Sequence, residues 1–524
     1  MLPSVSSWAE ETEPVAASAR SPWRRAEIIA LVALILIAGL IRFIDIADPN
    51  ELVFDEVYYA KDACVYAGFG QEVCEIAEES TYVHPPLGKW LISGGVKIFG
   101  YDSFGWRFVP FLAGVISVGL LFAVARKLFR SLVPAVLAAG LLAIDPLHFV
   151  QSRTSMLDIF VPMFGLAALL CILRDRDRML ATHDVESASL LSDKKVLARP
   201  WRAVAGVLGG LALSAKWSGG LVLLLVIVLT IAWELSARRE LGRRKAFMAT
   251  ARRELPSIVL YLVLLPVIAY IATYIGRLGG DVFALPWAEG SWGRNLWERH
   301  AYMYDFHKHL EARHSYESPP WSWMFIKRPV SYFFCSDTTE VPCSPPVGPS
   351  TYQEIFATGS PFVWWTSILA LVFTGAQWLW RRDMRRAEGV IFAGFCLTYL
   401  PWLLIASGRS AVFIFYLLPT IPFMCLALAN VAASIGRSWE AKATIAVFAA
   451  GAIGMFAFLY PLLVKNDIPE PSWRKRIWIF DNCDKPPGPV VTSTATITNG
   501  DQLSTTVSET NDNSSIPPNG WCWI

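Results

Sequence analysis

The stretch Phe54-Asp55-Glu56-Val57-Tyr58-Tyr59 places two adjacent carboxylates directly after the first long apolar run of the chain. Charged side chains are costly to keep close to hydrocarbon, so an acid pair at a membrane boundary indicates a function. A carboxylate can take the proton from an attacking hydroxyl group. If this end of the run faces outward, Asp55 and Glu56 are placed to activate a hydroxyl for reaction with a lipid-carried donor.

Other polar residues that could bind a substrate stand at the ends of later apolar runs. They are His84 and Lys89 in His84-Pro85-Pro86-Leu87-Gly88-Lys89, then Arg107, Arg153, Asp158, Lys216, Arg409 and Tyr416. Cations can hold a phosphate leaving group and neutralise its charge as it departs. Each residue also has a structural interpretation: the acid pair could cap a surface helix, and the arginines could snorkel at an interface. Their common location favours a site for a phosphate-linked sugar on a lipid.

The composition is that of a membrane protein. The chain has 524 residues, of which 54% are hydrophobic and 17% charged, against about 25% charged residues in globular proteins. Eleven apolar runs predict membrane-spanning helices. They lie near residues 27–46, 107–125, 132–147, 157–173, 203–214, 218–234, 257–275, 361–380, 388–406, 411–430 and 443–464. We therefore expect an all-α polytopic protein.

The distribution of Lys and Arg predicts the orientation of these helices. With a cytoplasmic N-terminus, the segments on the inside carry 26 of the 46 Lys and Arg residues, which satisfies the positive-inside rule. The N-terminal stretch is polar and lacks the pattern of a cleaved signal. The predicted organisation is a disordered cytoplasmic tail (1–26), a transmembrane catalytic domain (27–464) and an extracytoplasmic tail (465–524). Two long external loops, 47–106 and 276–360, lie within the domain.

Six of the nine cysteines fall on the predicted outer side, and they fall in pairs. The candidate disulfides are Cys64–Cys74, Cys335–Cys343 and Cys483–Cys522. Paired cysteines facing an oxidising compartment favour disulfides, and their spacing does not resemble a zinc site.

The motifs together resemble the protein O-mannosyltransferase family in its actinobacterial form. The resemblance rests on Phe54-Asp55-Glu56, the His84-to-Lys89 element, Arg107, Arg153 with Leu157-Asp158, and Ser214-Ala215-Lys216-Trp217. In the long loop it rests on His307, His314, Ser318, Trp321 and Trp323, which are similar to the family's acceptor-side loop elements. The order of these motifs covers most of residues 40–464. Two departures stand out: the loop 276–360 is too short for the β-trefoil domain of eukaryotic members, and Met324 stands where many members have Pro.

The resemblance implies a GT-C type glycosyltransferase fold, with amphipathic helices in the first external loop. It implies inverting transfer of mannose from polyprenyl-phosphate-mannose to Ser or Thr of a secreted protein at the outer face of the cell membrane. Asp55 would be the catalytic base, and Glu56 would organise acceptor and donor. Arg107, Arg153 and Arg409 would contact the donor phosphate.

The expected partners are the lipid donor, a Ser/Thr-rich acceptor protein and membrane lipids, with no nucleic acid. Coupling to the secretion translocon is compatible with an unfolded acceptor, although no residue points to it. Asp55, Glu56 and Asp158 are too sparse to demand a metal ion, so no cofactor is expected and a divalent cation stays unassigned.

Two other functions fit part of the pattern. A sibling lipid-linked sugar transferase acting on a glycolipid or glycan would share the acidic first-loop motif. A secondary transporter would need ionisable residues near the bilayer midplane and inverted repeats, and the sequence shows neither.

Overall fold

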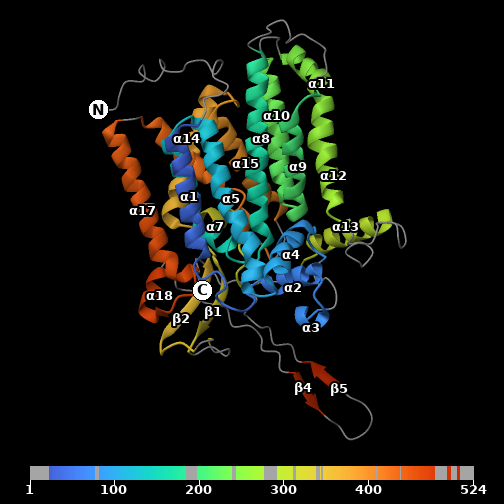
Figure 1. Ribbon diagram of the computed structural model, residues 1–524, viewed down its shortest axis with the longest axis vertical. Helices are drawn as coiled ribbons and strands as arrows, with labels where there is room; N and C mark the ends of the chain where they lie inside the picture. The colour runs from blue at the N-terminus through green and yellow to red at the C-terminus, as the bar shows by residue number, and fades with distance from the viewer. Residues whose placement is uncertain are drawn as a thin grey trace.

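The computed structural model describes most of the chain as one bundle of long helices with a smaller layer of short elements at one end (Figure 1). The described residues are 23–76, 82–183, 197–238, 243–275, 292–310, 314–337, 343, 346–406, 411–436, 438–477, 493–496 and 504–507. Arg409 and the Cys483–Cys522 pair lie outside them. The last two ranges are β4 (Ser493–Thr496) and β5 (Ser504–Val507), which form a hairpin.

Each of the eleven predicted spans overlaps a helix. Eight helical segments of the described chain are long and apolar enough to cross a membrane. They are α1 (Arg25–Phe43), α5 (Ser103–Phe129), α8 (Phe160–His183), α10 (Gly219–Ala237), α11 to α12 (Arg243–Ala272), α14 (Pro361–Arg381), α15 (Ala387–Ile405) and α17 (Trp439–Leu463). The other three predicted runs overlap the shorter α6 (Leu132–Ala143), α9 (Pro200–Ala215) and α16 (Ile421–Ser434), although 411–430 shares only its second half with α16. The protein is therefore a multi-pass membrane protein.

Several of these helices begin at residues that satisfy free backbone N–H groups. Asp102 accepts a hydrogen bond from Gly105 N at 2.8 Å at the start of α5. Ser360 and Ser438 cap α14 and α17 in the same way. Because the first turn of a helix leaves N–H groups unpaired, such side chains fix where each helix starts.

The first external loop folds into short helices, as expected. It contains α2 (Glu56–Ala67), α3 (Gln71–Cys74) and α4 (Leu87–Phe99). The predicted Cys64–Cys74 disulfide joins α2 to α3. A buried ion pair between Lys89 and Asp62, at 2.9 Å, joins α4 to α2. The loop is thus a rigid layer beside the bundle.

A small sheet that the all-α expectation omitted takes two strands from the predicted loop 276–360 and one from the segment after α17. It comprises β1 (Val330–Ser336), β2 (Thr351–Ala357) and β3 (Ile468–Pro469), all antiparallel. The predicted Cys335–Cys343 disulfide closes the β1–β2 connection. β1 and β2 contain Tyr and Phe, which suit a half-buried strand, although the sequence analysis predicts only a long loop for these residues.

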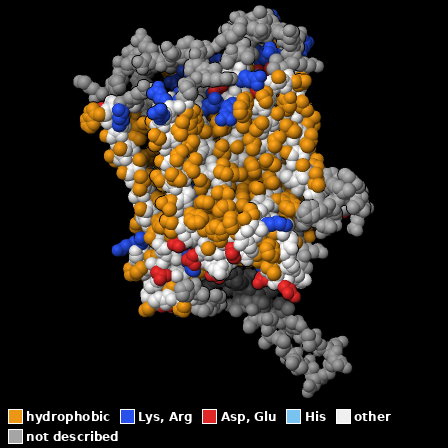
Figure 2. Space-filling view, in the orientation of Figure 1, with side chains coloured by type: hydrophobic (Ala, Val, Ile, Leu, Met, Phe, Trp, Pro, Cys, Tyr) orange, Lys and Arg blue, Asp and Glu red, His pale blue; other side chains and the backbone are white. Residues whose placement is uncertain are grey.

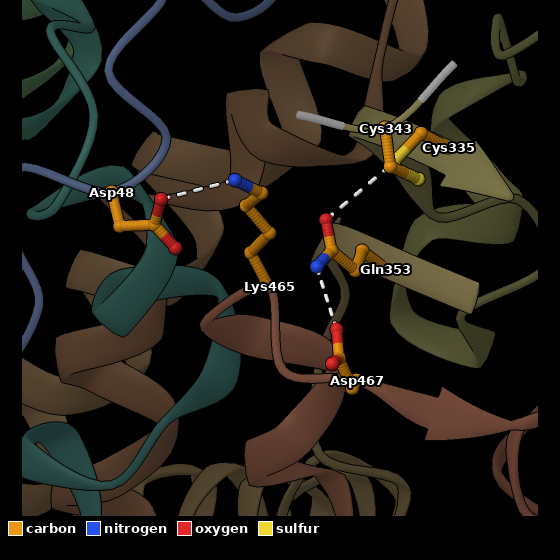
Figure 3. The surroundings of a disulfide bond; sticks show 6 residues. All are labelled: Asp48, Cys335, Cys343, Gln353, Lys465 and Asp467. Carbon is orange, nitrogen blue, oxygen red and sulfur yellow. Dashed lines mark hydrogen bonds and ion pairs between the residues drawn. A yellow bond between two sulfur atoms is a disulfide. The ribbon is translucent and has the colours of Figure 1, made fainter. Parts of the chain in front are cut away.

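Part of the predicted C-terminal tail belongs to the folded body. After α17 the chain adds β3 and α18 (Glu470–Arg476) to the sheet. Lys465 makes an ion pair with Asp48 of the first loop at 3.0 Å, and Gln353 of β2 donates to Asp467 at 2.6 Å (Figure 3). Trp473 is buried and donates to Glu354 at 2.7 Å. Residues 465–477 of the predicted tail thus pack against the sheet and the first loop.

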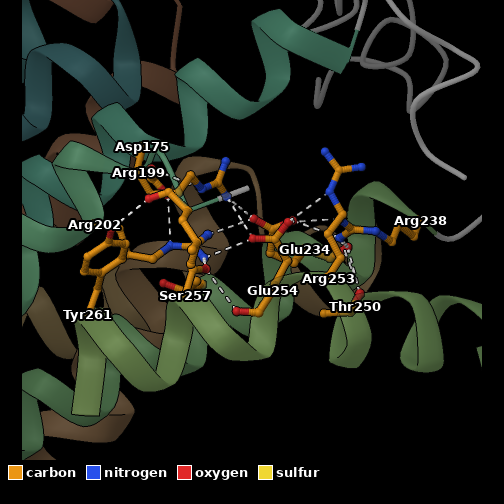
Figure 4. Close-up of polar contacts among 12 residues, drawn as sticks. Asp175, Arg199, Arg202, Glu234, Arg238, Thr250, Arg253, Glu254, Ser257 and Tyr261 are labelled. Carbon is orange, nitrogen blue, oxygen red and sulfur yellow. Dashed lines mark hydrogen bonds and ion pairs between the residues drawn. The ribbon is translucent and has the colours of Figure 1, made fainter. Parts of the chain in front are cut away.

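Charge separates the two ends of the bundle. Figure 2 shows Lys and Arg mainly along the end opposite the short elements, and most of the visible Asp and Glu beside those elements. At the end that is rich in Lys and Arg, α8, α9, α10 and α11 meet in a buried network of ion pairs (Figure 4). There Arg202 binds Glu234 at 2.9 Å, Glu254 at 3.0 Å and Asp175 at 3.3 Å. Burying these charges is tolerable because each has partners of opposite sign.

Candidate functional site

The acid pair lies where the first external loop meets the ends of the bundle helices. Asp55 is the residue before α2, and Glu56 is its first residue. Phe54, just before them, adopts a left-handed backbone with φ of 48°. Its ring stacks on Tyr332 of β1 at 4.4 Å between centroids, and His314 contacts it at 6.1 Å. The unusual backbone of Phe54 is therefore held by aromatic packing from the second loop.

Glu56 is buried and its carboxylate is fully engaged. Oε1 accepts from Arg107 Nε at 2.9 Å and from Ser155 N at 2.7 Å. Oε2 accepts from Arg107 Nη2 at 2.8 Å and from Val53 N at 3.0 Å. The bidentate pairing with Arg107 fixes the start of α2, and with it the adjacent Asp55.

Arg107 has no N–H group left for a phosphate in this structure. Besides its two bonds to Glu56, it donates to the backbone carbonyls of Ile46, Pro49 and Glu51 at 2.9–3.2 Å. All five guanidinium N–H groups are thus used inside the protein. The geometry does not favour the expected contact with the donor, because the arginine is occupied in ordering the first loop.

Arg153 and Lys89 also act within the fold. Arg153 donates to the carbonyls of Arg42, Ile44 and Asp45, at the C-terminal end of α1. A cation there satisfies carbonyls that the helix itself cannot pair. Lys89 is buried against Asp62. Sequence spacing alone could not distinguish these internal partners from a phosphate.

Lys216 is the expected cation that the structure places at a cavity. It follows α9 in the turn to α10, where a side chain at Gly219 would collide with the backbone of Ala212 at 2.2 Å. This tight turn aims Lys216 at Asp158, whose two oxygens it contacts at 2.9 and 2.8 Å. Its ammonium also lies 4.8 Å from the ring centre of Tyr416, a distance that suits a cation–π contact.

Asp55 differs from Glu56 in its surroundings. It is partly exposed, and its one hydrogen bond from a side chain comes from Tyr59 at 3.5 Å. Burial raises the pKa of Asp55 to about 6, while Lys216 acts to lower it and Asp158 to raise it further. A carboxylate with a pKa near neutrality is a better general base than an ordinary aspartate. Asp55 therefore has the properties that a proton acceptor needs.

The cavity beside these residues has a volume of about 440 Å³ and opens to solvent. Its lining comes from the first loop, the α9–α10 turn with the start of α10, helix α13 (Trp292–Lys308), the end of α15 and the short helix Ile414–Leu417. The residues are His84, Lys216, Trp217, Ser218, Gly220, Leu221, Tyr304, His307, Lys308, Trp402, Ile405 and Tyr416. His84, His307, Lys216 and Tyr416 are thus brought together, as the sequence predicted.

The two expected tryptophans of the second loop separate. Trp323 is buried and packs behind the cavity wall, 6.0 Å from the rings of both Trp402 and Tyr416. Trp321 is 54% exposed and stacks under Lys327 instead. The two residues stand two positions apart in a 3₁₀ helix (Pro320–Phe325). Because such a helix has about three residues per turn, residues i and i+2 point in different directions.

Several site residues were not predicted from the sequence. Tyr304 and Lys308 are two of them. They share one face of α13 with the predicted His307, and their i, i+3, i+4 spacing is the signal that could have identified them. Tyr59 stands four residues after Asp55 in a helix, which is the same signal. Tyr332 had no such signal, because its place depends on the sheet. The described part of the chain contains no group of three His, Cys, Asp or Glu side chains suited to a metal ion.

Comparisons with known proteins agree with the expected family. The model of the dolichyl-phosphate-mannose-protein mannosyltransferases matches residues 32–276, and that of the C-terminal four-transmembrane region of protein O-mannosyltransferase matches residues 293–481. The fold is similar to that of the S. cerevisiae protein O-mannosyltransferase Pmt1–Pmt2 complex bound to the sugar donor. The TM-score is 0.67 at 15% identity, over 88% of this chain and 93% of that one. This supports the GT-C type fold.

Sequence relatives span nearly the whole chain. The polyprenol-phosphate-mannose–protein mannosyltransferase of Mycobacterium tuberculosis is 32% identical over 85% of this chain and 90% of its own length. The Mycolicibacterium smegmatis protein of the same name is 31% identical over 87% and 93%. On this similarity, the chain belongs to the protein O-mannosyltransferase family of membrane glycosyltransferases.

Proposed function

We propose that this protein transfers mannose from a polyprenyl-phosphate-mannose donor to Ser or Thr hydroxyls of a protein acceptor. The names of relatives that align with more than four fifths of the chain support the donor and the protein acceptor. The observation that carries the proposal for this chain is Asp55 near the Lys216–Asp158 pair, in which Lys216 lines a solvent-open cavity. The arrangement supplies a base and a cation at one place.

The proposed reaction is a single displacement with inversion at the sugar. The acceptor oxygen forms a bond to C1 of mannose, while the bond between C1 and the phosphate oxygen breaks. The hydroxyl proton passes to Asp55, and the electron pair leaves with polyprenyl phosphate. Lys216 stabilises the negative charge of the departing phosphate. This division of roles follows from the raised pKa of Asp55 and the position of Lys216 on the cavity wall.

Glu56, Arg107 and Arg153 are positioning residues in this proposal. Glu56 and Arg107 are fully engaged by the protein, and Arg153 donates to three backbone carbonyls at the C-terminal end of α1, so they order the first loop around Asp55. His84 and Tyr416, at the same cavity, are proposed donor contacts. His307 and Trp323 belong to the acceptor side.

The proposed mechanism uses no metal ion, because Lys216 supplies the positive charge at the phosphate. Arg409 stays a proposed phosphate contact that lies outside the described residues. We place the site on the extracytoplasmic side of the cell membrane. The gathering of Lys and Arg at the opposite end of the bundle (Figure 2) supports this orientation, since basic residues favour the cytoplasmic side.

The experiment is a transfer assay with the purified protein in lipid vesicles, radiolabelled polyprenyl-phosphate-mannose and a Ser/Thr-rich peptide. Wild type, Asp55→Asn and Asp62→Asn are compared, the last as a control that alters a buried carboxylate of the same loop. Peptide labelling that is lost in Asp55→Asn and kept in Asp62→Asn supports the proposal. Label that enters only a lipid or glycan refutes the protein acceptor, and transfer abolished by a chelator refutes metal independence.

A further inference from the structure

The external helix α13 forms one wall of the cavity and attaches to the bundle through a small separate cluster. In Figure 1, α13 projects sideways from the end of the bundle near α2 and α4. Its residues Tyr304, His307 and Lys308 line the cavity. Met303, on the same helix, packs with Tyr270 and Tyr274 in a hydrophobic cluster distinct from the main core.

The hydroxyl of Tyr270 is the polar centre of this cluster. Trp217 Nε1 donates to it at 3.0 Å. The hydroxyl of Tyr274 lies 3.0 Å away, and Nε2 of His300 lies 2.8 Å away. Tyr270 is only 8% exposed, so these groups are its partners in place of bulk water. One oxygen thus joins the end of α12, the α9–α10 turn and α13.

The direction of each hydrogen bond follows from the available protons. His300 Nδ1 lies 2.7 Å from the backbone carbonyl of Leu296, and a carbonyl only accepts, so Nδ1 carries the ring proton. In the neutral ring Nε2 then accepts, and Tyr270 is its donor. Because Tyr270 has a single proton, Tyr274 must donate to Tyr270 rather than the reverse. Removing this hydroxyl therefore takes a hydrogen-bond partner from the buried Tyr274 and from the half-buried Trp217 and His300.

Two of the elements that Tyr270 joins, the α9–α10 turn and α13, both line the cavity. Trp217 follows Lys216 directly, and its ring also contacts the rings of His300 at 6.4 Å and His307 at 5.7 Å. Lys216 itself is held by Asp158, without help from Tyr270. Loss of the hydroxyl is thus expected to shift the α13 wall more than the cation.

We propose that Tyr270 is a positioning residue that holds α13 against the Lys216–Trp217 turn and so sets how the acceptor polypeptide binds. This inference rests on the proposed function for its acceptor. The polypeptide approaches from the aqueous side, where α13 stands outside the helix bundle, whereas the donor phosphate meets Lys216.

The test compares Tyr270→Phe with Tyr274→Phe. The two changes remove the same atom from neighbouring buried tyrosines, but among the described residues the Tyr274 hydroxyl bonds to Tyr270 alone. We expect Tyr270→Phe to raise the KM for the acceptor peptide about tenfold, from the loss of bonds worth about 1 kcal/mol or more. The kcat and the KM for the donor should stay within about twofold, as should all three constants of Tyr274→Phe. A fall in kcat at unchanged acceptor KM, or the same effect in both variants, overturns the proposal.

A second readout does not depend on activity. Hydrogen exchange of the α13 amides should become about tenfold faster in Tyr270→Phe, while α14 keeps the wild-type rates. Unchanged exchange in α13 overturns the positioning role, even when the enzyme is active. If the wild type labels no peptide, the proposed function fails, and the exchange of α13 still decides whether Tyr270 holds this helix.

Discussion

Replacing Glu56 with Gln tests whether this carboxylate positions the site or reacts in it. Each oxygen of Glu56 accepts one bond from Arg107 and one from a backbone N–H. A glutamine amide must point its NH₂ group at one of these two donor pairs, whichever way it is turned. The change therefore breaks at least two hydrogen bonds and leaves the buried guanidinium without its counter-charge.

The magnitude follows from burial. Glu56 and Arg107 are 0% and 1% exposed, and removing one partner of a buried ion pair costs about 3–5 kcal/mol. We expect the unfolding free energy of Glu56→Gln to fall by this amount. Since Asp55 is the preceding residue, we also expect kcat to fall about 100-fold, the effect of a misplacement of about 1 Å in a catalytic group.

The assay combines thermal unfolding in detergent with transfer kinetics on the folded fraction. The matched control is Asp62→Asn, which breaks another fully buried ion pair of the first loop, with Lys89. The control should lose comparable stability and keep kcat within a few-fold. If Glu56→Gln unfolds like the wild type but transfers no mannose, Glu56 contacts the substrate and the positioning assignment is refuted.

Three further predictions concern the base, the cation and a disulfide. Asp55→Asn should lower kcat by at least about 100-fold, the usual contribution of a general base, without loss of stability; an active variant would move the base elsewhere. Because Asp55 must be deprotonated and its pKa is about 6, kcat/KM should rise with pH up to about 6 and then level off. Lys216→Met removes the cation that lowers this pKa, so the rise in the pH–rate profile should move to higher pH. An unchanged profile would show that Lys216 does not influence the pKa of Asp55. Replacing both Cys335 and Cys343 with Ser should lower the unfolding free energy by about 2–4 kcal/mol, and unchanged denaturant unfolding would contradict a structural disulfide.

Hydropathy was sufficient to locate the helices of this fold. The predicted run 361–380 differs from α14 by one residue at its C-terminal end. The run 257–275 was less accurate, because α11 begins at Arg243. Its polar residues Glu254 and Ser257 bind Arg202, and such contacts let a helix continue past the apolar stretch. Periodicity detects an apolar face, but it cannot detect a helix end held by ion pairs.

The small sheet could not be predicted for a related reason. β1 and β2 are separated by fourteen residues, and β3 follows more than a hundred residues later. Pairings between such distant segments depend on where the surrounding helices place them. The Tyr and Phe residues of β1 and β2 suit a strand, but aromatic residues are equally common at a membrane interface, so composition alone did not identify the strands. The residues that the sheet adds to the site, such as Tyr332, could therefore not be predicted from the sequence.

The same limit explains which site residues the sequence assigned well. Residue type and spacing placed Asp55, Lys216, Arg107 and Lys89 at one end of the bundle, with Asp55 as the base, but gave the three cations the same role as substrate contacts. The structure separates them by how fully their polar groups are engaged. Arg107 uses every N–H group and Lys89 is completely buried, so neither can bind a ligand without first breaking the fold. Asp55 keeps lone pairs free of hydrogen bonds and Lys216 has one carboxylate partner beside a cavity. A reacting group must retain bonding capacity for the substrate, and this capacity is a property of three-dimensional contacts.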